Sequence, residues 1–365
     1  MGFKCGIVGL PNVGKSTLFN ALTKTASAQA ANFPFCTIEP NIGDVAVPDE
    51  RLDKLADIAQ SANRIPARLS FVDIAGLVRG ASKGEGLGNQ FLANIREVDA
   101  IAHVLRCFED SDITHVEGKI DPLADADTVE TELMLADLES LEKREANLRK
   151  KATTKDKEAI AELELVDLAL AELREGRPAR KADIPENRAR DWKNLQLITS
   201  KPVIYVCNVE EDSAESGNSL SAKVAEKAAA ENAEAVVISA RIEEELAQLD
   251  DAERLEYLET LGLAEPGLNR LIRQGYGLLD LITYFTAGPK ESRAWTVKRG
   301  TAAPQAAGVI HTDFERGFIK AETIAYADYT ELNGEAGARD AGRLRQEGKD
   351  YVVEDGDVML FRFNV

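Results

Sequence analysis

The feature of this chain that most limits its fold is an eight-residue motif near the N-terminus. Residues Gly9–Ser16 read GLPNVGKS; the apolar run Cys5–Val8 precedes them and the helix-forming run Thr17–Leu22 follows. A glycine-rich turn between a buried strand and a helix directs backbone N–H groups and the helix dipole toward phosphate oxygens. The sequence therefore predicts a phosphate-binding loop in an α/β domain whose sheet is mostly parallel.

Individual residues of this loop have predicted roles. Lys15 is expected to reach the outer phosphates and to assist catalysis, and the Ser16 hydroxyl is expected to bind Mg²⁺. The residues expected to contact the nucleotide along the loop are Asn12, Val13, Gly14, Lys15, Ser16 and Thr17. An unrelated glycine turn is the alternative, and the strand and helix that flank the motif argue against it.

Composition limits the class of protein. A chain of 365 residues is long enough for two or three domains. Its net charge of −19 argues against a protein that coats nucleic acid indiscriminately, so any RNA contact must come from local basic patches. The four cysteines form no C-x-x-C pair, which argues against zinc and disulfides. We expect a cytoplasmic protein without a membrane partner, because no segment reads as a leader or a membrane span.

The hydrophobic pattern divides the chain into three parts. Residues 1–130 and 197–280 alternate short apolar strands with helical segments, as expected of the phosphate-binding domain. The strands predicted in residues 1–130 are Lys4–Val8, Val45–Val47, Arg68–Asp73 and Ala100–Cys107. Residues 131–196 carry two amphipathic runs around a polar break, which predicts an inserted antiparallel helical hairpin resembling a coiled coil. Residues 281–364 read as a small α+β module.

A second motif follows the predicted strand Arg68–Asp73. Asp73 begins an Asp-x-x-Gly sequence at the carboxyl end of that strand, where a carboxylate can hold Mg²⁺ through water. The Gly76 N–H is expected to sense the γ-phosphate. Thr37, on a loop between the two motifs, is expected to complete the Mg²⁺ shell when a triphosphate is bound. As a lone feature Thr37 would be an ordinary surface threonine, so its role depends on the other two motifs.

Base recognition departs from the usual pattern. Guanine-specific switch proteins present Asn-Lys-x-Asp after a buried strand, whereas this chain has Asn208, Val209, Glu210 and Glu211. Glu211 is one methylene longer than the aspartate, and a misplaced hydrogen-bonding partner can cost orders of magnitude in discrimination. Ser239, Ala240 and Arg241 match the usual second base-contacting loop, whose backbone suits either purine. Specificity for guanine is therefore doubtful.

The group that activates water is not obvious from the sequence. Leu77 follows the Asp-x-x-Gly motif, at the position where many relatives have glutamine. Of the three histidines, His103 lies in an apolar strand and is expected to have a satisfied partner, and His311 is expected to be structural or a surface contact. His115 follows a strand in a polar stretch, on the nucleotide side of the sheet.

These motifs resemble the YchF/Obg-like ATPase family, a branch of the Obg-related switch proteins, and the resemblance runs nearly end to end. It implies a P-loop G domain, a coiled-coil insertion and a C-terminal TGS module with the ubiquitin-like β-grasp fold. It also implies slow hydrolysis of ATP to ADP and phosphate in preference to GTP, and ribosome association through rRNA and ribosomal proteins. His115 is implied as the stand-in catalytic group. The matching segments are Gly9–Ser16, Asn32–Asn41, Asp73–Val78, Gly80–Phe91, Asn208–Glu211 and Thr286–Phe318.

The sequence supports two interpretations of some features. Asn12 either helps to seat K⁺, as in potassium-stimulated relatives, or bonds its own backbone. The chain is expected to be a monomeric ATPase; a true GTPase and a non-catalytic ATP-binding module are the alternatives. Two groups of basic residues either contact rRNA or are solvated surface. They are Lys143, Arg144, Arg149, Lys150, Lys151, Lys155 and Lys157 at the hairpin turn, and Arg316, Lys320, Arg343, Arg345 and Lys349 in the C-terminal module.

Overall fold

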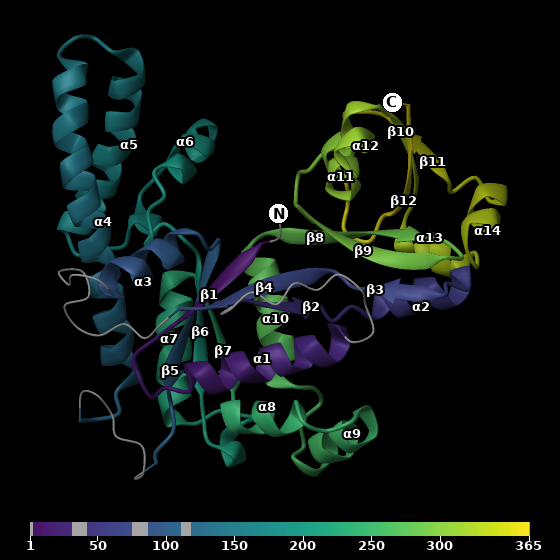
Figure 1. Ribbon diagram of the computed structural model, residues 1–365, viewed down its shortest axis with the longest axis horizontal. Helices are drawn as coiled ribbons and strands as arrows, with labels where there is room; N and C mark the ends of the chain where they lie inside the picture. Colours follow the sequence, from purple (N-terminus) through teal and green to yellow (C-terminus); the bar gives the residue numbers. More distant parts are fainter. Residues whose placement is uncertain (1–2, 31–41, 75–86, 111–117, 365) are drawn as a thin grey trace. The chain divides into compact units, whose positions relative to one another are not determined.

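The computed structural model describes residues 3–30, 42–74, 87–110 and 118–364 (Figure 1). The chain forms two compact units. The first combines residues 3–43 with 70–271, and the second combines residues 44–69 with 272–365. Among the described residues, no helix is long and apolar enough to cross a membrane.

A six-stranded sheet forms the centre of the first unit. Strand β1 pairs in parallel with β4 and β5, β5 with β6, and β6 with β7, which confirms the mostly parallel α/β sheet. The strand order is β2 (Ile42–Ala46), β4 (Arg68–Asp73), β1 (Lys4–Val8), β5 (Ala100–Arg106), β6 (Val203–Asn208), β7 (Glu234–Ile238). Parallel strands end at the same edge, so the carboxyl ends of β1, β4, β5, β6 and β7 lie together there.

Helices and short 3₁₀ turns connect these strands. They include α1 (Lys15–Ala30), α3 (Leu87–Arg96), η4 (Glu211–Ser213) and α7 (Ser219–Glu231), and the helices that follow β7 are α8 (Ala240–Leu246), α9 (Asp251–Thr260) and α10 (Gly267–Leu278). Strand β2 differs from the predicted strand Val45–Val47 and begins three residues earlier. Helices α1 and α8 follow the two loops that were predicted to contact phosphate and base, and they pack against each other.

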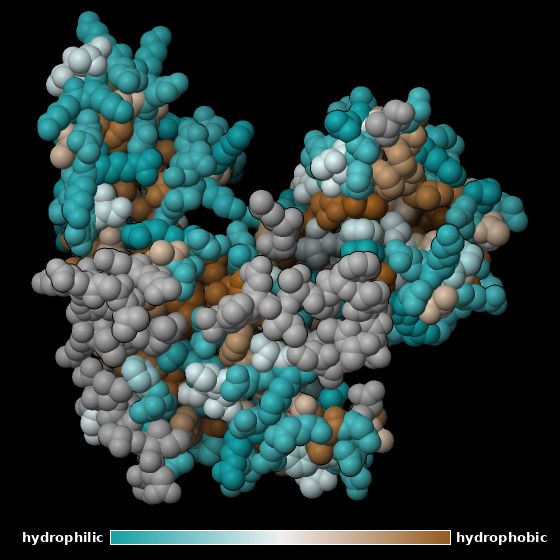
Figure 2. All heavy atoms as spheres, viewed as in Figure 1, coloured by the Kyte–Doolittle hydropathy of each residue, from teal (hydrophilic) through white to brown (hydrophobic). Residues whose placement is uncertain are grey.

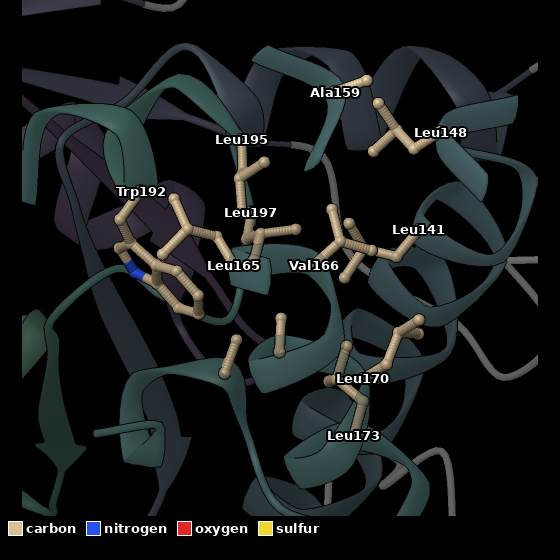
Figure 3. Packing of buried hydrophobic residues seen from close by; sticks show 12 residues of the cluster. Leu141, Leu148, Ala159, Leu165, Val166, Leu170, Leu173, Trp192, Leu195 and Leu197 are labelled. Carbon is tan, nitrogen blue, oxygen red and sulfur yellow. The ribbon is translucent and has the colours of Figure 1, made fainter. Parts of the chain in front are cut away.

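The insertion is an antiparallel hairpin of α4 (Pro122–Ala152) and α5 (Lys157–Arg174). Helix α4 begins nine residues before the predicted boundary at Thr131, because Asp121 caps it by accepting from the Ala124 N–H and Pro122 takes the first position. Short turns η2 (Ala179–Lys181) and η3 (Glu186–Arg188) and helix α6 (Ala189–Asn194) follow. Figure 3 shows the shared core, formed by Leu141, Leu148, Ala159, Leu165, Val166, Ala169, Leu170, Leu173, Ala179, Trp192, Leu195 and Leu197.

A buried carboxylate fixes the base of the hairpin. Asp137 of α4 accepts from the Ile198 N–H at 3.0 Å, the Thr199 N–H at 2.8 Å and the Thr199 hydroxyl at 2.7 Å. Burial raises the pKa of Asp137, and these donors oppose that shift. The segment that leads into β6 is therefore tied directly to α4.

A second six-stranded sheet forms the second unit. Its order is β11 (Arg345–Glu347), β10 (Phe318–Ile324), β12 (Val358–Phe363), β8 (Leu281–Ala287), β9 (Glu291–Lys298), β3 (Asn63–Ile65). Strands β12 and β8 are parallel, whereas β8 and β9, β10 and β12, and β10 and β11 are antiparallel. The remaining helices are α2 (Glu50–Ala59), α11 (Ala303–Ile310), α12 (Thr312–Arg316), α13 (Tyr326–Glu331) and α14 (Glu335–Asp340). A helix-covered mixed sheet agrees with the β-grasp expectation, and its assignment as a TGS module stays a prediction.

Residues 44–69 belong to a different compact unit from the one predicted for them. They were placed with the phosphate-binding domain, whereas most of their contacts are in the second unit. Strand β3 pairs in parallel with β9, and Ser61 donates to the Gly288 carbonyl at 2.8 Å. Arg51 of α2 forms ion pairs with Asp49 at 2.8 Å and Asp355 at 2.7 Å. These contacts join residues far apart in the sequence, so no pattern within residues 44–69 predicts them. The other predicted domain boundaries remain predictions.

Candidate nucleotide-binding site

The predicted phosphate-binding loop joins β1 to α1. Gly14 has φ +94°, and a Cβ there would lie 2.3 Å from Nδ2 of Asn208. A Cβ on Gly9 would lie 2.4 Å from the Val104 carbonyl oxygen. Both positions require glycine, since a side chain would displace backbone or a buried amide. Asn12, with φ +62°, takes a left-handed conformation that asparagine tolerates.

Lys15 begins α1 and is almost fully buried. Its ammonium donates to the Leu10 carbonyl at 2.6 Å, which folds the side chain along the loop. Burial lowers the pKa of Lys15 to about 8, and the nearby Asp73 carboxylate opposes this shift. A bound polyphosphate would stabilise the ammonium and raise this pKa again.

Asp73 lies at the end of β4, in register with Ile7 of β1. Burial raises the pKa of Asp73, and the charge of Lys15 lowers it. A carboxylate and a hydroxyl are hard oxygen donors of the kind that Mg²⁺ prefers, and neither Asp73 nor Ser16 is buried, so the donor chemistry of these two side chains fits Mg²⁺. Within the described ranges no group of three or more histidines, cysteines, aspartates and glutamates could hold a metal by itself.

Three predicted site residues fall outside the described parts of the chain. They are Thr37, predicted for Mg²⁺, Gly76, predicted to sense the γ-phosphate, and His115, predicted to be catalytic. Their roles remain predictions.

Asn208 is a brace between three elements. Its Nδ2 donates to the Val13 carbonyl at 2.9 Å, and its Oδ1 accepts from the Ala240 N–H at 2.9 Å. The side chain is buried, and both bonds go to protein backbone. Asn208 therefore fixes the phosphate-binding loop and the start of α8 relative to β6, a role that the motif alone does not specify.

A cavity of about 600 Å³ lies at this edge of the sheet. Its walls bring together residues from the phosphate-binding loop, the segment after β5, the segment after β6 and the start of α8. The lining residues are Asn12, Gly14, Thr17, Phe108, Glu109, Asp110, Asn208, Val209, Glu210, Glu211, Ser239, Ala240, Arg241 and Glu244. All six residues predicted for the base side, Asn208–Glu211 with Ser239 and Ala240, line the same cavity. The walls contributed by Phe108–Asp110 and Glu244 were not predicted, whereas Arg241 belongs to the loop that was.

Arg106 holds one of the unpredicted walls. It is the largest fully buried side chain of the described residues. Its guanidinium donates to the Phe108 carbonyl at 3.2 Å and the Asp110 carbonyl at 3.0 Å, and lies 4.6 Å from the centre of the Phe108 ring. The sequence did contain a signal for this wall. Arg106 ends the apolar strand β5, and a buried charged side chain requires hydrogen-bonding partners.

Arg241 and Glu211 form an ion pair at the rim of the cavity. Nε of Arg241 lies 2.9 Å from Oε1 of Glu211. Glu211 opens η4, immediately after β6, and Arg241 is the second residue of α8. The carboxylate predicted to face the base is thus engaged by a residue of the neighbouring loop.

The other two histidines lie elsewhere. His103 is buried in β5 with its ring centre 5.8 Å from that of Tyr205, and burial lowers its pKa to about 3. Its Nε2 has no hydrogen-bond partner among the described residues, so the expected satisfied partner was wrong for this atom. His311 caps α12, its Nδ1 accepting from the Asp313 N–H at 3.1 Å, in line with the structural role expected of it.

Comparison with known proteins places this site in a family. Residues 4–136 match the model described as "50S ribosome-binding GTPase", and residues 281–364 match the YchF-GTPase C-terminal model, described as a protein of unknown function. The chain is 60% identical to the ribosome-binding ATPase YchF of Haemophilus influenzae over the full length of both proteins. The chain belongs to the YchF family. It is also 54% identical to the ribosome-binding ATPase YchF of Bacillus subtilis, again over the full length of both.

A solved structure extends this result to the whole fold. The YchF GTPase of Schizosaccharomyces pombe superposes with a TM-score of 0.89 at 40% identity, covering 99% of this chain and 98% of that one. A GTP-binding protein of Pyrococcus horikoshii has a TM-score of 0.62 at 19% identity, covering 99% and 100%, and shows the fold alone. The YchF family assignment agrees with the resemblance carried by the sequence motifs.

Proposed function

We propose that this protein is a ribosome-associated P-loop NTPase that hydrolyses ATP to ADP and phosphate in preference to GTP. The observation that carries the proposal is the Asn208 brace, which fixes the phosphate-binding loop and the base side of one cavity in a single arrangement. Relatives that match this chain over their full length are named ribosome-binding ATPases. The nucleotide state would act as a switch in translation.

The preference for ATP rests on the base side of the cavity. Guanine needs a carboxylate that accepts from its N1–H and amino group. Glu211 is longer than the usual aspartate, and its carboxylate is paired with Arg241. Val209, which replaces the usual lysine, presents no ammonium. Discrimination against GTP follows, because a guanine would lose its acceptor or break an ion pair.

Hydrolysis is assigned to a small set of groups. Lys15 stabilises charge on the outer phosphates, and His115 positions the attacking water in place of the usual glutamine. Mg²⁺, held by Ser16, Asp73 and Thr37, would neutralise charge on the β- and γ-phosphates when bound. Asn12 would help to seat K⁺. The chain would act as a cytoplasmic monomer whose turnover is slow until a partner brings His115 into its catalytic position.

Single-turnover hydrolysis tests this proposal. Radiolabelled ATP and GTP are each mixed with excess protein in potassium buffer, with and without 70S ribosomes. We expect faster cleavage of ATP than of GTP, and a further acceleration by ribosomes. Faster GTP cleavage would favour a true GTPase, in which Glu211 releases Arg241 to bind guanine. No cleavage under any condition would favour a non-catalytic ATP-binding module.

A further inference from the structure

The turn between α4 and α5 carries four lysines whose ammonium groups pair with no carboxylate in the described chain. These are Lys150, Lys151, Lys155 and Lys157, which we call the lysine tip. All four are exposed. In Figure 1 this turn lies at the end of the hairpin away from the sheet of the first unit, and Figure 2 shows a hydrophilic surface there.

The basic residues beside the lysine tip are neutralised. Lys143 pairs with Glu139 at 2.6 Å, Arg149 with Glu145 at 2.6 Å, and Arg144 with Glu162. The lysine tip therefore differs from the rest of the basic group that the sequence singled out. Its ammonium groups are available to an external anion.

The second basic group, in the C-terminal module, is mostly neutralised too. Its ion pairs are Arg316 with Asp313, Lys320 with Glu322, Arg343 with Asp328, and Arg345 with Glu347 and Asp357. Only Lys349 has no such partner among the described residues. Of the two candidate surfaces, the hairpin turn is the one with a cluster of unpaired cations.

Stabilisation of the helix ends accounts for the presence of only two of the four lysines in the lysine tip. Lys150 and Lys151 lie in the last turn of α4, where the helix dipole favours cations. Lys157 is the first residue of α5, where the dipole disfavours them. Lys155 has φ +60°, a conformation that favours glycine or asparagine. Two of the four lysines thus lie where a solvated helix end would not select them.

The local charge also opposes that of the chain. Residues 149–158 hold five basic and two acidic residues, a net charge of 5 − 2 = +3, in a chain of net charge −19. One of the two acids, Asp156, is occupied in capping α5, where it accepts from the N–H groups of Glu158 and Ala159 at 3.0 and 3.1 Å. A compact positive surface in an acidic protein suits a polyanion.

We propose that the lysine tip binds the phosphate backbone of ribosomal RNA. This rests on the proposed ribosome association and names one surface that makes the contact. The segment 149–158 contains no aromatic residue to stack on bases, and the lysine ammonium groups act as point charges. The tip therefore positions the protein on RNA and reads no sequence.

The test compares two variants of equal charge. The tip variant is Lys150→Gln/Lys151→Gln/Lys155→Gln/Lys157→Gln. The control neutralises four exposed lysines outside both basic groups: Lys24→Gln/Lys54→Gln/Lys223→Gln/Lys290→Gln. Binding to purified 70S ribosomes is measured by sedimentation over a series of KCl concentrations. ATP hydrolysis without ribosomes, expected to be unchanged in both variants, verifies that each remains folded.

The tip variant is expected to bind at least about tenfold more weakly at low salt, with a slope of log affinity against log salt reduced by about 3 units. The control is expected to stay within about twofold of the wild type. If the tip variant has the affinity and slope of the wild type, the proposed contact of the lysine tip with RNA is wrong, while ribosome association is unaffected. An equal loss in the control would also overturn it, by reducing the effect to net charge. Failure of the wild type to bind ribosomes would overturn both the proposed ribosome association and the proposed RNA contact of the lysine tip.

Discussion

Arg241 holds Glu211 through an ion pair of 2.9 Å at the rim of the nucleotide cavity. Glu211 occupies the position at which guanine-specific proteins place their base-reading aspartate. Because both partners are partly exposed, the pair is weak, at about 0.2–1 kcal/mol. Even this small bias works against guanine, because a guanine must draw the carboxylate away from the guanidinium.

Removal of Arg241 should therefore relax base selection. Arg241→Ala is expected to tighten GTP binding by up to about fivefold, the factor that corresponds to an exposed ion pair, and to leave ATP binding nearly unchanged. Arg241→Lys retains a cation and should behave like the wild type. Fluorescent nucleotide titrations measure both ligands. Equal changes for ATP and GTP would show that Arg241 contributes to binding without regard to the base.

The pKa of Lys15 predicts how ATP affinity varies with pH. Burial sets this pKa to about 8 in the free protein, and only the protonated ammonium attracts phosphate. Affinity should stay high below pH 8 and fall by up to about tenfold per unit as pH rises above it, since the complex must then take up a proton. Titration calorimetry between pH 6.5 and 9.5 checks this. Constant affinity up to pH 9.5 would contradict the assignment.

His115 should affect hydrolysis and leave binding intact. His115→Ala is expected to abolish ribosome-stimulated ATP hydrolysis, because the group that positions water is lost, with ATP affinity within about twofold of the wild type. His311→Ala, a change at the cap of α12, serves as the control and should retain stimulation. Retained stimulation in His115→Ala would remove His115 from the mechanism.

Asp137 should be central to the attachment of the helical hairpin. Asp137→Ala leaves two buried N–H groups and a hydroxyl without their acceptor, which should cost about 3 kcal/mol of unfolding free energy. Asp137→Asn keeps one acceptor oxygen and should cost less. Urea denaturation gives both values. A loss below about 1 kcal/mol for the alanine variant would mean that water replaces the carboxylate.

Short sequence patterns were sufficient to predict the elements whose structure depends mainly on neighbouring residues. Strands β1 and β4 were predicted to the residue, because strands buried in a parallel sheet read as short apolar runs before turn residues. The loop Gly9–Ser16 was predicted for the same reason, since its glycines meet a steric requirement at fixed spacing. The start of α4 could have been found from Asp121 and Pro122, which are ordinary helix-start signals.

Long-range pairing was what the sequence could not supply. Strand β3 is three residues long, and its place in the second sheet depends on β9, more than two hundred residues later. The Glu211–Arg241 pair and the wall held by Arg106 likewise join separate loops. Residue types on each loop were visible in the sequence, but their partners follow from tertiary structure.

The most direct test of this account is the pair of equilibrium dissociation constants for Mg·ATP and Mg·GTP, measured on the purified protein in potassium buffer. We predict tighter binding of ATP, because Glu211 is withheld from guanine by its length and by Arg241. Tighter binding of GTP would mean that Glu211 serves as a surrogate for aspartate, and would contradict the proposed ATPase.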